Sequence, residues 1–258
     1  MIGKILGAGL LTGLGLAIYA RYIEPKRIEV TDIDLGGDLT VALVTDIHIN
    51  PHFHATDLAP TIRQLERIQP DVILFGGDFI SESPRFLREL EAPLRQMAAT
   101  ARIGSWGVWG NHDIANIRAR VAPVLANSGI TMLTNEVAHL AGDLWVVGID
   151  DALLGTPEIA ATFAQVPDGA RVIALWHEPD WAEKVAPFNP QIMLSGHTHG
   201  GQMRLPIIGP LATPLLGKRH VAGHYNIDGM PLYVSRGIGM YRPPLRLHSR
   251  PEIVLIHI

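Results

Sequence analysis

The chain has 258 residues, and its 21 Lys and Arg residues against 25 Asp and Glu residues give a formal net charge of −4. This balance excludes a general nucleic-acid-binding protein, so we expect no nucleic acid as a stable partner. Hydrophobic residues make up 47% of the chain and charged residues 18%, which supports a buried core and excludes wholesale disorder. The sequence contains no cysteine, which excludes disulfides, a thiolate nucleophile and cysteine-ligated metal sites. Any metal ion must therefore bind His, Asp, Glu or Asn side chains.

The N-terminal segment is predicted to interact with a membrane. Residues Ile5 to Ala20 carry no charge, Lys4 precedes them, and Arg21 and Lys26 follow. As a helix this stretch would be about 24 Å long, short of a ~30 Å hydrocarbon core unless flanking residues reach the interface. We favour a retained anchor, while a cleaved signal peptide and a buried apolar helix remain open. The flanking cations are too evenly divided to fix the side of the membrane on which the protein lies.

The rest of the chain is predicted to form one domain. No linker rich in Gly, Ser or Pro and no block of charge interrupts it after Glu29. We therefore divide the chain into residues 1–29, a membrane anchor or signal segment with a linker, and residues 30–258, a single folded domain.

Short apolar runs alternate with helical patterns along this domain. The runs predicted as buried strands are 39–44, 72–75, 106–109, 144–149, 172–175 and 192–194. Apolar residues at helical spacing predict one helix over 58–68 and another over 114–125. This alternation predicts an α/β domain. The last quarter of the chain shows only strands, at 232–234 and 253–256, which predicts a second, more antiparallel sheet.

Polar side chains that can bind metal ions follow most of the predicted strands. In chain order they are Asp46, His48, Asp78, Asn111, His112, Asp113, His177, His197 and His199. Open α/β sheets place their binding sites at the carboxyl ends of strands, where all of these residues fall. Each one alone is more often a cap, a turn residue or a satisfied polar group. Together they offer enough ligands for two cations bridged by one carboxylate.

These residues make the chain resemble the calcineurin-like metallophosphoesterases. The motifs of that family are, in chain order, D-x-H, G-D, G-N-H-[DE], a single H and G-H-x-H, and all of them are complete here. The sequences GHTHGGQ at 196–202 and YVSRGIG at 233–239 are similar to a bacterial membrane-associated subgroup of phosphodiesterases. The resemblance implies a four-layer α/β/β/α sandwich for residues 30–258. It also implies a membrane-associated protein of the bacterial cell membrane.

The resemblance further implies two divalent metal ions held by seven side chains. The implied ligands are Asp46, His48 and His199 for one ion, Asn111, His177 and His197 for the other, and Asp78 as the bridge. A donor set without thiolate suits Mn, Fe, Zn or Mg, and we take manganese as the first candidate. The resemblance places His112 near the leaving group, and Asp113 is a candidate to orient it.

Such a centre can promote the hydrolysis of a phosphate ester. Two divalent cations and two carboxylates leave a charge of about +2, which attracts a phosphate, and a metal-activated water can attack phosphorus in line. We therefore expect a phosphodiesterase or pyrophosphatase that acts at a membrane on a phosphate ester, with a lipid-linked ester as one option. Two alternatives stay open: the pyrophosphatase of lipid A synthesis that splits UDP-diacylglucosamine, and a non-catalytic metal-binding scaffold of the same fold.

Three further features have open roles. Asp150 and Asp151 end the strand 144–149, and capping is the favoured interpretation of this pair over ligand tuning. We expect at least one of Arg236, Arg242 and Arg246 to face the cleft, because a guanidinium group binds phosphate well. The apolar run 203–216 contains three prolines and cannot be a long helix, so it is a lid, a core-packing loop or a membrane-touching surface.

Overall fold

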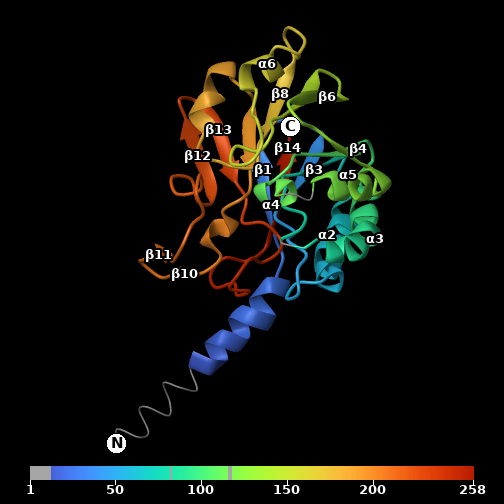
Figure 1. The fold of residues 1–258 in the computed structure, drawn as a ribbon. Coiled ribbons are helices and arrows are strands. Elements are labelled where there is room, and N and C mark those ends of the chain that lie inside the picture. The colour runs from blue at the N-terminus through green and yellow to red at the C-terminus, as the bar shows by residue number, and fades with distance from the viewer. Residues whose placement is uncertain (1–12, 82, 116–117) are drawn as a thin grey trace, which may run out of the picture.

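Two β-sheets pack face to face, and helices cover their outer faces (Figure 1). The computed structural model describes residues 13–81, 83–115 and 118–258. Within these residues each of the two sheets has six strands. The predicted four-layer α/β/β/α sandwich is therefore confirmed.

The first sheet has the order β1-β14-β2-β3-β4-β5. Its strands are β1 (Glu29–Asp34), β14 (Glu252–His257), β2 (Thr40–Val44), β3 (Val72–Phe75), β4 (Gly104–Gly107) and β5 (Ile130–Met132). The strands β2 to β5 are parallel to one another, while β14 runs antiparallel to β2. The carboxyl ends of β2, β3 and β4 therefore lie at one edge of the sheet.

The second sheet has the order β12-β13-β9-β8-β7-β6. Its strands are β12 (Gly223–Ile227), β13 (Met230–Val234), β9 (Ile192–Ser195), β8 (Arg171–Leu175), β7 (Leu144–Gly148) and β6 (Glu136–Ala141). The four central strands β13, β9, β8 and β7 are parallel. Its carboxyl-terminal edge meets that of the first sheet, which brings polar loops from both sheets together.

The core fills the spaces between the layers. Alternate residues of the strands, such as Leu43 and Leu74 from the first sheet and Val146 and Leu175 from the second, are fully buried between the two sheets. The other residues of the first sheet pack against the helices α2 (Ala59–Ile68), α3 (Leu87–Ala98) and α5 (Arg118–Asn127). The outer face of the second sheet packs against α6 (Ile159–Phe163) and two short helical turns, η5 (Ala182–Lys184) and η6 (Ala186–Phe188).

Three sequence predictions about elements need correction. The single helix predicted over 114–125 is wrong: α4 (Asn111–Ile114) ends before Ala115, which has a non-helical ψ of 74°, and α5 is a separate helix. The helix α3 was not predicted, although Leu87, Leu90, Leu94 and Met97 are buried at helical spacing. The strands at the end of the chain form no sheet of their own, because β13 joins the second sheet and β14 inserts between β1 and β2.

The described part of the N-terminal segment is helical. It runs from residue 13 through a wider turn, η1 (Tyr19–Ile23), to η2 (Glu24–Lys26). No helix among the described residues is long and apolar enough to span a bilayer. The first twelve residues of the predicted anchor lie outside the described residues.

We predict that Leu43→Ala lowers the free energy of unfolding by about 2–5 kcal/mol, because it leaves a cavity between the two sheets. Chemical denaturation at equilibrium measures this change. Ile103→Ala is the matched control, since Ile103 is 47% exposed and its truncation should change the unfolding free energy by less than about 0.5 kcal/mol. Equal effects of the two variants would contradict the arrangement of the core.

Candidate metal centre

The structure gathers the predicted ligands at the meeting edges of the two sheets. Asp46 and His48 follow β2, and Asp78 follows β3. Asn111, His112 and Asp113 form the first turn of α4, just beyond β4. From the second sheet, His177 follows β8, and His197 and His199 follow β9. Side chains that are up to 153 residues apart in the sequence thus share one site.

The backbone at this site is held in an uncommon conformation. Five predicted ligands have φ in the left-handed region, namely Asp46 (55°), His48 (49°), Asp78 (56°), His197 (71°) and His199 (51°). Residues other than glycine seldom adopt this region, and each instance costs on the order of 1–3 kcal/mol. The surrounding structure enforces it, because the amide of Asp46 donates to Gly77 O at 2.9 Å and the amide of His48 donates to Asp78 O at 3.0 Å. Strain of this kind concentrates at functional sites.

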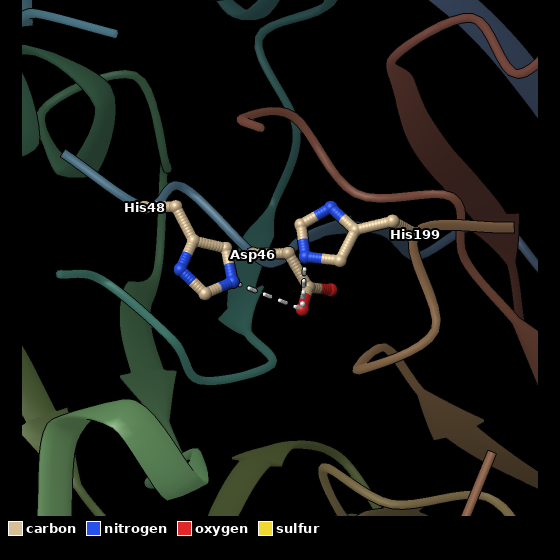
Figure 2. Close-up of side chains that lie close together, drawn as sticks. All are labelled: Asp46, His48 and His199. Atoms are coloured by element: carbon tan, nitrogen blue, oxygen red, sulfur yellow. Dashed lines mark ion pairs between the residues drawn. The ribbon is translucent and has the colours of Figure 1, made fainter. Parts of the chain in front are cut away.

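The first group of donors consists of Asp46, His48 and His199. Figure 2 shows one nitrogen of each imidazole ring directed at the same oxygen of the Asp46 carboxylate. Asp46 Oδ1 lies 3.9 Å from His48 Nε2 and 3.6 Å from His199 Nε2. One donor atom from each of the three buried side chains lies within 4.8 Å of the others. This spacing leaves room for one cation among them.

The second group consists of Asp78, His177 and His197, and it meets the same spacing criterion. Asp78 Oδ2 lies 3.2 Å from His177 Nε2 and also 3.2 Å from His48 Nε2, which belongs to the first group. A single carboxylate oxygen therefore stands between the two groups. Asp78 Oδ1 accepts a hydrogen bond from the amide of His112 at 2.9 Å, which fixes the orientation of the carboxylate.

Hydrogen bonds orient the imidazole rings. His177 Nδ1 donates to Gly76 O at 2.6 Å, and His197 Nε2 donates to Leu215 O at 2.7 Å. His48 Nδ1 is 3.0 Å from the Ser81 hydroxyl. In each ring the opposite nitrogen faces the candidate site, as in metal-ligating histidines whose other nitrogen bonds to an oxygen.

Two buried polar atoms in this site lack a hydrogen-bond partner. Asn111 Oδ1 and His177 Nε2 make no hydrogen bond within the described structure, although both atoms are shielded from solvent. Leaving a buried polar atom unsatisfied costs roughly 1–3 kcal/mol. A divalent cation would satisfy both atoms, and imidazole, carboxylate and amide donors are ligands of the kind that Mn, Fe, Zn and Mg accept. The residues present therefore fit a pair of metal ions.

The electrostatics of the site agree with this fit. Burial acts to raise the pKa of Asp78, but the charges of His177 and His48 outweigh it and hold that pKa well below its ordinary value. Burial lowers the pKa of His197 to about 4 and, with the charges of His48 and Arg246, lowers that of His199 well below its usual range. These two imidazoles are therefore neutral at neutral pH, which is the form that binds a metal.

His177 differs from the other two rings. Burial would lower its pKa, but the charges of Asp78 and Asp46 raise it well above the ordinary value. Without a cation the two carboxylates therefore favour the protonated form of this ring. A metal ion would replace that proton, so metal binding at this site should release it.

His112 and Asp113 have different surroundings. His112 Nδ1 donates to Ser81 O at 2.9 Å, and burial lowers the pKa of this imidazole. Asp113 is fully buried, and its carboxylate accepts from four backbone amides. The donors are Asp78 N, Phe79 N, Ile80 N and Gly110 N, at 2.8 to 3.3 Å. Asp113 therefore holds the loop that carries Asp78, whereas Ser81 takes the orienting role towards His112 that we expected of Asp113.

A cavity of about 400 Å³ opens beside these side chains. It is lined by His48, Asp78, Asn111, His112, His197 and His199, by the apolar residues Met203, Pro214 and Leu215, and by Tyr241 and Arg242. Tyr241 was not predicted, and its ring lies 4.8 Å from that of His112. No sequence motif marks it, because the contact depends on how the C-terminal loop folds back.

The three candidate arginines lie in three different environments. Arg242 lines the cavity, as we expected of at least one of them. Arg236 instead pairs with the buried Glu252 at 2.9 Å. Arg246 is completely buried, and its guanidinium donates to backbone carbonyls, including Gly237 O at 3.0 Å, while Nη2 lies 3.5 Å from His199 Nδ1. Arg246 thus contacts the ring nitrogen of His199, a predicted ligand, on the side of Nδ1.

The structure shows what the paired acids Asp150 and Asp151 bind and how the apolar run 203–216 folds. Asp151 Oδ1 accepts from Leu153 N at 3.0 Å and Asp150 Oδ2 accepts from Thr156 N at 3.0 Å, so both acids cap the turn after β7 as expected. Residues 203–215 form a hairpin with the short strands β10 (Arg204–Leu205) and β11 (Gly209–Pro210). We call it the β10–β11 hairpin.

Comparison with known proteins places the chain in a class. Residues 39–201 match the family model of the calcineurin-like phosphoesterases. The chain therefore belongs to this family, which confirms the resemblance drawn from its motifs.

Three relatives illustrate the match. The chain is 34% identical to the uncharacterized metallophosphoesterase YkuE of Bacillus subtilis, over 97% of this chain and 92% of that protein. It is 27% identical to the phosphodiesterase YaeI of Escherichia coli, over 93% of this chain and 92% of that protein. It is 30% identical to a transmembrane protein with a metallophosphoesterase domain of Danio rerio, over 93% of this chain and 60% of that protein.

We predict that Asp113→Ala lowers the free energy of unfolding by at least ~2 kcal/mol, because it removes the acceptor of four buried amides. Chemical denaturation measures the change. Asp143→Ala is the control, since Asp143 is 58% exposed in a surface ion pair with Arg171, and a surface pair contributes little to stability. If Asp113→Ala were as stable as the control, its role in holding the Asp78 loop would be refuted.

Proposed function

We propose that this protein is a phosphodiesterase that uses two divalent metal ions and acts at a membrane. The observation that carries the proposal is the position of Asp78 Oδ2, which lies 3.2 Å from a histidine nitrogen of each donor group. A carboxylate shared in this way is suited to hold two cations roughly 3.5–4 Å apart. Membership of the phosphoesterase family supports a phosphate ester as substrate.

The proposed ligands follow from the two donor groups and the partnerless atoms. They are Asp46, His48 and His199 for one ion, Asn111, His177 and His197 for the other, and Asp78 for both. Manganese is our first candidate for the metal, with Fe, Zn and Mg as alternatives. The bound ions would supply positive charge for the phosphoryl oxygens and would activate a water for attack.

The residues of the chain itself then position and protonate the substrate. His112 Nδ1 is committed to Ser81 O, so Nε2 is the nitrogen that can exchange a proton with the leaving oxygen. Arg242 lines the cavity and can bind a substrate oxygen. Met203, Pro214 and Leu215 give the cavity an apolar wall, which suits the organic group of an ester.

Two further points support the finer parts of the proposal. A relative similar over nearly its whole length is named a phosphodiesterase, which favours diesters over monoesters. A second relative is named a transmembrane protein, and the apolar sequence of residues 5–20 suits a membrane anchor. We propose that residues 1–29 hold the catalytic domain, residues 30–258, at the cell membrane.

The test of this proposal combines metal analysis with hydrolysis. The purified protein is assayed for bound metal, stripped with a chelator, and given a chromogenic phosphodiester with and without added manganese. We expect about two metal ions per chain and activity that disappears on stripping and returns with manganese. A metal-loaded protein that hydrolyses neither diesters nor monoesters would instead favour a non-catalytic scaffold.

Asp78→Asn should lower metal occupancy and activity together. The amide keeps the shape of the side chain but removes the negative charge between the two donor groups, so at least one ion should bind more weakly. We expect turnover to fall at least 100-fold, measured on the purified variant alongside its metal content. Unchanged turnover would refute the bridging assignment.

His112→Ala should leave metal content unchanged and slow hydrolysis by roughly 10²–10⁴-fold. Its side chain is assigned a proton rather than a metal ion, so the loss should grow as the leaving group becomes more basic. A series of aryl and alkyl diesters of rising leaving-group pKa measures this dependence. Equal losses across the series would show that His112 does not act on the leaving oxygen.

A further inference from the structure

The β10–β11 hairpin exposes large apolar side chains, two at its tip and two after β11. Ile207 is fully exposed, Ile208 is 71% exposed, and Leu211 and Leu215 are 51% and 63% exposed. Single exposed apolar residues are ordinary, but four of them along one projecting hairpin indicate a contact surface. In Figure 1 this hairpin projects away from the two sheets.

The backbone of the tip presents one of these side chains outward. Ile207 has φ 71°, a conformation that is unfavourable for a β-branched residue. Glycine or asparagine would adopt this conformation with less strain and would be the usual choice for a turn exposed only to water. The turn instead carries an isoleucine that makes no use of its side chain within the domain.

The hairpin is tied to the end of the N-terminal helix. Arg204 N donates to Leu247 O at 2.8 Å, so the first strand of the hairpin is bonded to the segment 246–249. The same segment is bonded to the helix, since Arg246 N donates to Ala20 O at 2.9 Å and Ser249 N donates to Glu24 Oε1 at 2.6 Å. The helix and the hairpin therefore keep fixed positions relative to each other.

This end of the domain also carries a concentration of positive charge. A groove of about 370 Å³ begins where the N-terminal helix ends. Its charged lining residues are Lys26, Arg27, Arg63, Arg67 and Arg250, with Glu29 as the one carboxylate. A basic groove at the end of the N-terminal helix and exposed apolar side chains on the hairpin, which the segment 246–249 ties to that helix, are together complementary to a bilayer that contains anionic lipids, which offers phosphate groups above hydrocarbon.

We propose that the β10–β11 hairpin is a second membrane contact. Its tip enters the interface of an anionic bilayer, while the basic groove binds lipid phosphate groups. Met203 and Leu215, at the two ends of the hairpin, also line the cavity beside the donor groups. The apolar part of a lipid-borne phosphodiester can therefore reach the site along the hairpin. This statement about substrate rests on the proposed function, whereas the membrane contact does not.

The chain contains no cysteine, which allows a direct test of the contact. Ile207→Cys in the full-length protein is labelled with an environment-sensitive fluorophore and reconstituted into vesicles of phosphatidylcholine and phosphatidylglycerol. Ile103→Cys is the matched control, because Ile103 is exposed and lies before β4, away from the hairpin. We expect nitroxide-bearing lipids to quench the label at position 207 at least twofold more than the label at position 103.

Aqueous iodide should show the reverse preference, quenching the label at position 103 more strongly. Equal quenching at both positions by lipid-borne and aqueous quenchers would overturn the proposal. Protection of the label at position 207 before vesicles are added would also overturn it, because that result indicates a contact between protein chains.

A second experiment tests the consequence for substrate. The double variant I207S/I208S and the unaltered protein are compared on a fluorogenic phosphodiester with a lipid tail in the same vesicles and on a soluble chromogenic diester. We expect a loss of at least fivefold on the vesicle-borne diester and unchanged hydrolysis of the soluble one. Equal rates on the vesicle-borne diester, or equal losses on both, would overturn the proposed route.

The two experiments separate the possible failures. If the unaltered protein hydrolyses neither diester, the proposed phosphodiesterase function fails, while the labelling result still decides whether the hairpin contacts the bilayer. If the soluble diester is hydrolysed and the label at position 207 remains in water, the hairpin proposal alone is wrong.

Discussion

The rest of the site depends on the carboxylate of Asp78, which is placed between donor groups from the two sheets. One oxygen lies 3.2 Å from both His48 Nε2 and His177 Nε2, and the other is fixed by the amide of His112. Since His48 follows a strand of the first sheet and His177 a strand of the second, the site exists only when the two sheets are packed. The packing of the core between the sheets is therefore also what assembles the metal centre.

Holding this carboxylate in place requires support from groups that touch no substrate. Asp113 accepts from the amides of the Asp78 loop, and Gly76 O and Ser81 orient the imidazoles of His177 and His48. These contacts offset the cost of the left-handed backbone at five ligand positions. The cluster of predicted ligands is buried, has a strained backbone and contains polar atoms without hydrogen bonds, all of which lower the stability of the fold. A bound cation therefore accounts for the cluster better than a structural role.

Local sequence pattern was sufficient to predict the central strands of both sheets and the helix α2, although it missed α3. Buried strands are short apolar runs, and each ligand motif stands directly after one, so the ligand set could be predicted before any coordinates. Contacts through space could not be predicted. Asp113 was a candidate to orient His112, yet its carboxylate accepts from the amide of Asp78, 35 residues away in sequence. In the same way, the ion pair between Arg236 and Glu252 could not be predicted. The end of α4 at Ala115 could not be predicted either, because it interrupts an otherwise continuous apolar pattern.

The position of Arg246 connects the candidate metal centre to the N-terminal helix. Its guanidinium lies 3.5 Å from His199 Nδ1, while its backbone amide is bonded to Ala20 of the N-terminal helix. A charged group that is fully buried is costly unless its donors are satisfied, and here the carbonyls of Gly237, Gly239 and Ser249 accept from the guanidinium. Burial still lowers the pKa of Arg246 to about 10, far above neutral pH, so the group remains charged. The same residue thus links the N-terminal helix, the loop at Gly237 and His199, so the helix is joined to the candidate site by packing and hydrogen bonds.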